Sequence, residues 1–99
     1  MGKKVLYFIT CKEETGIQLA LEHSDDDDIT ILLLQNAVYF ANKSNKGIGE
    51  AIRKNREVAA AKEDVEVRGL NEYLSDGVQL VSDSDIIDIV FNSDNIINM

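Results

Sequence analysis

The chain has 99 residues, the size of one domain, and 44% of them are hydrophobic and 28% charged, as in a soluble globular protein. Ten Lys and Arg residues stand against eighteen Asp and Glu residues, which gives a net charge of −8. Because nucleic acids and anionic membranes are bound through clustered Lys and Arg, this balance argues against direct binding to either. We therefore expect a single domain over residues 1–99 that contacts no nucleic acid and no membrane.

The cysteine content and the short apolar runs exclude further kinds of site and segment. The single cysteine, Cys11, excludes an intrachain disulfide and a cysteine-rich zinc site. The longest apolar runs, 5–9 and 37–41, are far shorter than the roughly 20 residues of a membrane-spanning helix. Residues 1–4 and the short run after them do not resemble a secretion signal. We expect a cytoplasmic location, and the residue pattern indicates neither a cofactor nor a metal site.

The first half of the chain alternates between strand and helix patterns. Strands are predicted at 5–9 and 29–34, where uninterrupted apolar residues are typical of a parallel sheet covered on both faces. Between them we expect a helix capped by Thr15, followed by a solvated turn at the four aspartates 25–28. A short helix is then predicted over 37–41.

The second half continues the alternation. After a loop over 42–49, the Ala, Lys, Arg and Glu residues of 50–62 predict a surface helix. Further elements are expected as strands at 65–67 and 78–81, a helical turn near 70–74 ended by Gly77, a helix over 86–91 capped by Ser82 or Asp83, and an edge strand at 96–97. This order predicts the α/β class: a three-layer α/β/α sandwich with a mostly parallel sheet of four to five strands.

Cys11 is the strongest nucleophile of the chain by residue type. It directly follows the first predicted strand, at the edge of an α/β sheet where ligands usually bind. The helix that follows and Lys12 favour the thiolate, whereas Glu13 and Glu14 oppose it. Two interpretations remain open, a reactive sulfur nucleophile and an unreactive residue of a strand-end loop.

Gln35 and Asn36 follow the second predicted strand at the same edge. Asn36 either caps the next helix or, with Gln35, presents a polar group to a cleft or a partner subunit. Tyr39 and Phe40 come next, on a helix too short to bury every side. Since aromatic residues are enriched in interface cores, they indicate either a subunit contact or packing on the domain's own sheet.

Two further features favour structural roles. His23 has no second histidine with which to bind a metal, so we expect a surface or helix-capping residue. Residues 46–50 contain a Gly-x-Gly that precedes a helix pattern, but Glu50 would repel a phosphate there. We expect this segment to be a flexible loop.

Three segments carry a resemblance to a known family. Residues 31–41, with the sequence ILLLQNAVYFA, resemble a signature of the DsrE/DsrF/DsrH-like sulfur-relay proteins, and 65–77 and 78–89 are similar to two later segments of that family. Size and element order resemble those of the DsrH/TusB branch. The resemblance implies a subunit that assembles with DsrE/TusD-like and DsrF/TusC-like partners. Such complexes pass a persulfide sulfur between cysteines, for 2-thiolation of the tRNA wobble uridine or for sulfur oxidation.

The resemblance does not assign a catalytic role to Cys11. DsrH-type members that have a cysteine carry it in the first helix, where Leu21 stands here. Besides the sulfur-relay subunit, two functions therefore stay open. One is a non-catalytic homo-oligomeric assembly or binding module, and the other is a stand-alone persulfide carrier that uses Cys11. The residues expected to make the contact in an assembly are Gln35, Asn36, Tyr39 and Phe40.

Overall fold

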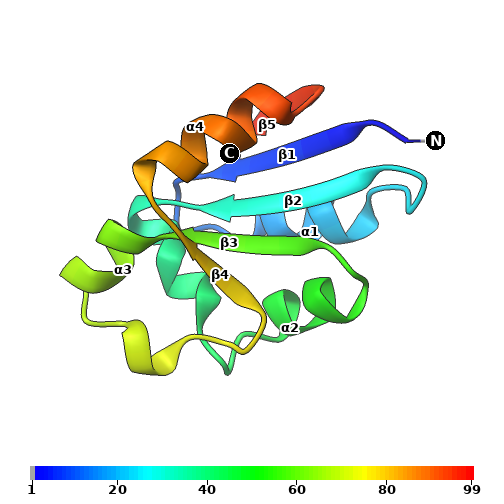
Figure 1. Cartoon of the computed structure of the whole chain (residues 1–99). Helices are drawn as coiled ribbons and strands as arrows, with labels where there is room; N and C mark the ends of the chain where they lie inside the picture. Colours follow the sequence, from blue (N-terminus) through cyan, green and yellow to red (C-terminus); the bar gives the residue numbers. More distant parts are fainter. Residues whose placement is uncertain (1) are drawn as a thin grey trace.

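Five parallel strands form the centre of the computed structural model, which describes residues 2–99 (Figure 1). The strands are β1 (Lys4–Ile9), β2 (Asp28–Leu33), β3 (Glu57–Ala61), β4 (Val78–Val81) and β5 (Asn95–Asn98). Their order is β4-β3-β2-β1-β5, which confirms the predicted α/β class and parallel sheet. Met1, which the expected domain bounds included, lies outside the described residues.

The handedness of the connections decides which face each helix covers. The helical elements are α1 (Thr15–Glu22), the 3-10 helix η1 (Gln35–Ala41), α2 (Lys46–Arg53), α3 (Lys62–Val67), the 3-10 helix η2 (Asn71–Tyr73) and α4 (Asp83–Asn92). Parallel crossovers are right-handed, so the three connections that step from β1 to β4 share one face of the sheet. The return from β4 to β5 steps in the opposite direction and places α4 on the other face (Figure 1).

The sheet buries side chains on both faces, which explains the uninterrupted apolar runs of β1 and β2. The larger core lies under α1, η1, α2 and α3, and its largest side chains include Tyr7, Ile9, Ile17, Ile31, Leu33, Phe40, Ile48 and Val65. The smaller core lies under α4 and consists of Leu6, Leu32, Ala59 and Val81, with Phe8, Leu34, Ile86, Ile89 and Val90 partly buried against them. Ser82, one of the two residues predicted to cap the last helix, caps α4, and its side chain forms a reciprocal capping box with Asp85.

Several predicted elements are wrong. Residues 57–61 form the buried strand β3 inside the stretch predicted as a surface helix, and 65–67 belong to helix α3 rather than to a strand. Pairing of β3 with both β2 and β4 outweighs the helix propensity of its three alanines. The segment expected as a flexible loop contains the start of α2, where the Asn45 side chain accepts the Ile48 N–H at 3.0 Å. Thr15 is the first residue of α1 and not its cap.

Arg56, which directly precedes β3, is hydrogen-bonded to the end of α1. It is 6% exposed, and its guanidinium donates to the carbonyl oxygens of Ala20 and His23 at 3.3 and 2.6 Å. It also donates to the Asp25 carboxylate at 2.8 Å. These bonds satisfy carbonyls that a helix end leaves without partners. The turn at residues 25–28, which the sequence predicted to be solvated, therefore also binds Arg56 through the Asp25 carboxylate.

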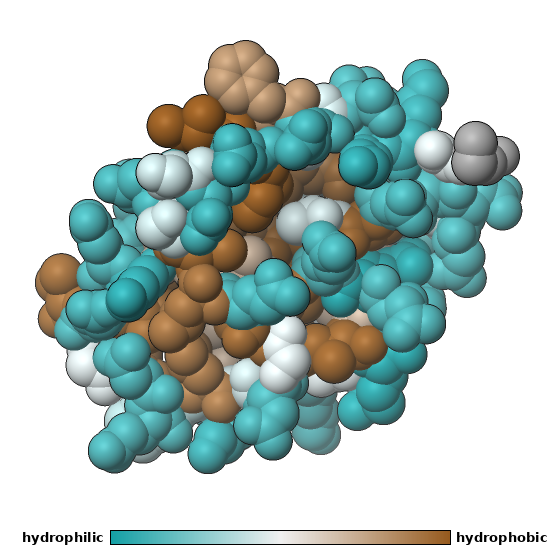
Figure 2. Space-filling model, in the orientation of Figure 1, coloured by the Kyte–Doolittle hydropathy of each residue, from teal (hydrophilic) through white to brown (hydrophobic). Residues whose placement is uncertain are grey.

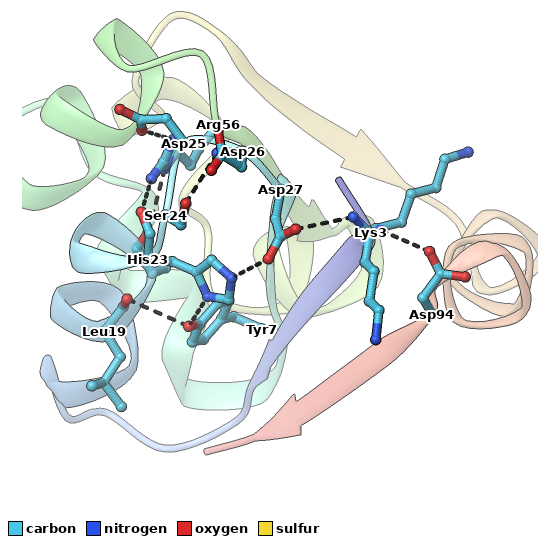
Figure 3. A network of polar contacts seen from close by, with 12 residues as sticks. Lys3, Tyr7, Leu19, His23, Ser24, Asp25, Asp26, Asp27, Arg56 and Asp94 are labelled. Atoms are coloured by element: carbon cyan, nitrogen blue, oxygen red, sulfur yellow. Dashed lines mark hydrogen bonds and ion pairs between the residues drawn. The ribbon is translucent and has the colours of Figure 1, made fainter. Parts of the chain in front are cut away.

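His23 joins three segments beside the same turn. Its Nδ1 lies 2.8 Å from the Tyr7 hydroxyl and its Nε2 lies 2.7 Å from the Asp27 carboxylate (Figure 3). The other oxygen of that carboxylate accepts the backbone N–H of Lys3 at 3.0 Å. The hydrogen bonds from His23 and Lys3 hold the pKa of Asp27 below its usual value, while burial raises the pKa of Tyr7. The histidine thus joins segments of the fold through both ring nitrogens, whereas the sequence predicted a surface or helix-capping residue.

We expect Arg56→Met to destabilise the protein strongly. The substitution keeps much of the apolar stem but leaves two carbonyls of α1 and one carboxylate without their donor, which costs about 3 kcal/mol. Arg53→Met removes the same charge from an exposed position of α2 and should cost less than about 0.5 kcal/mol. Urea unfolding of the three proteins measures the difference. Equal stability of the two variants would contradict the role given to Arg56.

We expect the Asp27 carboxyl to titrate below the value of about 3.9 of an unfolded aspartate. Because the folded pKa is the lower one, the stabilisation from this carboxylate is present at neutral pH and is lost as the pH falls through the folded pKa. Removing the imidazole in His23→Ala should raise the pKa of Asp27 toward its usual value. NMR titration of the carboxyl carbon measures both values, and an unchanged pKa in His23→Ala would contradict the assignment.

Candidate functional site

The carboxyl ends of β1, β2 and β3 meet at one edge of the sheet. Ile9 pairs with Leu33, and Leu33 pairs with Ala60, so the loops that follow these strands leave the sheet side by side. Ligands of open parallel sheets usually bind at this edge. The polar and aromatic residues there are called the strand-end cluster, which comprises Cys11, Lys12, Gln35, Asn36, Tyr39, Asp64 and Arg68.

Tyr39 is the centre of the strand-end cluster. Its side chain is 40% exposed, and the Lys12 Nζ lies 5.0 Å from the centroid of its ring. The Arg68 guanidinium carbon lies 5.9 Å from the same centroid. Both distances allow attraction between a cation and an aromatic face. The ring therefore connects the loop after β1 with the end of α3, and two cations border it in a chain that is acidic as a whole.

Gln35 is held in an unusual backbone conformation beside this ring. Its φ of 52° lies in the left-handed region, which costs a residue with a Cβ roughly 1–2 kcal/mol. The Asp64 carboxylate accepts the Gln35 N–H at 2.8 Å, and its second oxygen lies 3.5 Å from Arg68 Nη1. Strain of this kind is common where a fold positions functional groups. Asp64 thus fixes both the turn after β2 and the arginine that borders Tyr39.

Asn36 does not cap η1, so one of its two proposed roles is wrong. The N-cap residue of that helix is Leu34, and the Asn36 Oδ1 instead accepts a hydrogen bond from Arg68 Nη2 at 3.1 Å. The arginine reaches Asn36 because α3 lies against η1. Exposed Gln35 and Asn36 therefore belong to one polar surface with Tyr39 and Arg68.

Phe40 lies apart from this surface. It is 8% exposed and packs in the larger core, since η1 turns this ring toward the sheet while Tyr39 points outward. Of the two aromatic residues considered for a partner contact, only Tyr39 is therefore accessible.

Cys11 is exposed in the loop between β1 and α1, one residue before Lys12. The structure thus places the thiol where a reagent or a partner protein can reach it. An open hollow of about 520 Å³ is lined by the Tyr39 ring and by polar residues that include Gln18, Asn42, Ser44 and Lys46. Cys11 is not among the residues that line this hollow.

Sequence reasoning missed Asp64 and Arg68. The two residues lie four positions apart, a spacing at which opposite charges support a helix. This charge spacing indicated a helix, but the apolar residues Val65 and Val67 between the two charges favoured a strand, which is incorrect. Contact of Arg68 with Asn36 joins residues 32 positions apart, and no local pattern indicates it.

Within residues 2–99, no helix is both long enough and apolar enough to traverse a lipid bilayer.

Comparisons with known proteins identify the family and the fold. A family model described as DsrH like protein matches residues 11–96. The solved structure of the YchN protein of E. coli is similar over 100% of both chains, with a TM-score of 0.84 and 19% identity. A conserved protein of unknown function from Bacteroides thetaiotaomicron matches 97% of this chain and 95% of its own, with a TM-score of 0.79 and 17% identity. A search of curated proteins finds no match. Since the family model spans most of the sequence, the chain belongs to the DsrH-like family.

Proposed function

We propose that the protein is a subunit of a cytoplasmic sulfur-relay assembly that resembles those built with DsrE/TusD-like and DsrF/TusC-like partners. The observation that carries the proposal is the strand-end cluster, which combines an exposed thiol with an exposed, cation-bordered tyrosine in a DsrH-like chain. The thiol supplies a site for sulfur, and the tyrosine supplies a site for a partner. The net charge of −8 favours a protein as sulfur acceptor over direct contact with tRNA.

The chemistry of a relay is thiol–persulfide exchange. A Cys11 thiolate would attack the terminal sulfur of a donor persulfide, forming a new S–S bond while the bond to the donor sulfur breaks. The donor leaves as a thiolate, so the exchange needs no external oxidant or reductant.

The other polar groups of the cluster are suited to hold a partner. Tyrosine and arginine are enriched among residues that dominate binding energies, and both lie at this edge. The bond from Arg68 to Asn36 and the strained turn at Gln35 fix the polar groups before any partner arrives. A contact made by Gln35, Asn36 and Tyr39 would therefore lose little conformational entropy.

A purely structural role within the assembly is the second candidate. The resemblance expects the cysteine of DsrH-type members at the position of Leu21, and here this position is a buried core residue of α1. In that case Cys11 takes no sulfur, and the cluster serves only as an interface between this chain and a partner subunit or a second copy. The stand-alone carrier is the remaining case, in which Cys11 takes sulfur without any assembly.

We expect sulfur loading at Cys11 to separate a sulfur-carrying role from a purely structural one. After incubation with a low-molecular-weight persulfide donor and removal of excess reagent, intact-mass spectrometry should detect a gain of one sulfur atom. Dithiothreitol should remove the sulfur, and Cys11→Ser should gain none, since the chain has no other thiol. If the chain with Cys11 shows no gain in mass after this treatment, a carrier role is contradicted and the structural role is left.

We expect Tyr39→Asp to abolish assembly. An added carboxylate would draw Lys12 and Arg68 away from a partner and would place a charge in a desolvated contact. Tyr73→Asp is the matched control, because Tyr73 is the other exposed tyrosine and lies outside the strand-end cluster. Size-exclusion chromatography with light scattering, on the chain alone and with its copurified partners, measures the assembly. Assembly that survives Tyr39→Asp would contradict the proposed contact.

A further inference from the structure

Helix α4 has apolar side chains on two sides. Ile86, Ile89 and Val90 pack against the sheet, whereas Ile87 is 55% exposed and Phe91 is 84% exposed. These two exposed residues are four positions apart, so they form one stripe along the helix. Figure 2 shows apolar surface over α4 at the top of the view. A surface helix normally has only one apolar stripe. In α4 the stripe of Ile86, Ile89 and Val90 is already covered by the sheet, so Ile87 and Phe91 form a second one.

Apolar exposure on this side of the sheet continues beyond α4. Ile96 of the edge strand β5 pairs with Leu6, whose side chain belongs to the smaller core, so Ile96 lies on the same face as α4. It is also exposed. With one helix over five strands, this face has less cover than the opposite one. Ile87, Phe91 and Ile96 are called the α4 surface.

The C-terminal segment that contains the α4 surface carries charged side chains of one sign only. Residues 69–99 contain six acidic residues and no Lys, Arg or His, so they carry −6 of the total of −8, and residues 1–68 carry only −2. Asp83 and Asp88 adjoin the stripe, one a helical turn before Ile87 and the other directly after it. Among the described residues 2–99, no ion pair involves a carboxylate of α4.

A groove beside α4 strengthens the anionic character. It has a volume of about 420 Å³ and lies between the helix and the amino ends of β1, β2 and β3. Three carboxylates line it, from Asp28, Glu57 and Asp88, against the single ammonium of Lys4. A cationic side chain would find complementary charge in this groove while apolar side chains next to it contact the stripe.

We propose that the α4 surface binds a segment of another protein that presents apolar side chains flanked by Lys or Arg. A second copy of this chain fits poorly, because two α4 helices would bring Asp83 and Asp88 near their counterparts with no basic residue from 69–99 to offset them. A basic partner removes that repulsion and covers Ile87 and Phe91. The site lies on the opposite face of the sheet from α1, η1 and α2, and it does not depend on sulfur transfer.

Binding of a designed peptide tests the proposal. The probe is a fluorescein-labelled helical peptide of about 18 residues, with leucine along one face and lysine along its flanks. Fluorescence anisotropy should detect binding that weakens with added salt, and a peptide with glutamate in place of lysine should not bind. The double variant Ile87→Ser/Phe91→Ser should weaken binding by at least about tenfold, and it should stay folded because both side chains are exposed.

Charge variants separate a specific site from general attraction. Asp83→Asn/Asp88→Asn should weaken binding and flatten its salt dependence, whereas Glu13→Gln/Asp26→Asn removes the same charge from other exposed positions and should leave the affinity within about twofold. Equal losses in the two charge variants, or full binding by Ile87→Ser/Phe91→Ser, would overturn the proposal. The remaining alternative is that a second copy of the chain covers the α4 surface. Analytical ultracentrifugation of the chain alone tests it. A dimer that Phe91→Ser converts to monomer would assign the surface to a second copy and overturn the proposal.

Discussion

The right-handedness of parallel crossovers is the constraint on which the structure depends. Three successive connections step from β1 to β4 in one direction and must cover the same face, so one return connection is left for the other. Two features matter for function. Parallel pairing brings the loops after β1, β2 and β3 to a single edge. On the face that α4 covers, Ile87 and Phe91 of this helix point away from the sheet and stay exposed.

The two edges of the sheet have different tasks. At the amino ends of the strands, Arg56 and His23 bind the end of α1 to the turn before β2 through Asp25 and Asp27. At the carboxyl ends, Asp64 holds a strained turn and an arginine in place, yet Tyr39 and Cys11 remain exposed. The bonds that join α1 to the turn before β2 are thus separated, by the length of the strands, from the exposed thiol and tyrosine of the strand-end cluster.

Local sequence patterns were sufficient for much of this arrangement. Uninterrupted apolar runs identified β1 and β2, and the position of Cys11 and Gln35 after them placed both at one edge. The patterns failed where distant residues decide the outcome. The three alanines of β3 locally favour a helix, but pairing with β2 and β4 on both sides makes this segment a strand. Likewise, the contact of Arg68 with Asn36 depends on how α3 lies against η1. Phe40 is buried for the same reason, because the orientation of η1 on the sheet is a tertiary property.

We propose that the strand-end cluster of this DsrH-like chain works inside an assembly of proteins. Native mass spectrometry of the tagged protein, purified from its own cells at endogenous levels, is the sharpest test of this role. We expect stoichiometric complexes that contain other α/β subunits with an accessible cysteine, and we expect these complexes to be lost when Tyr39 is replaced. A chain that emerges alone and monomeric under these conditions would rule out this role.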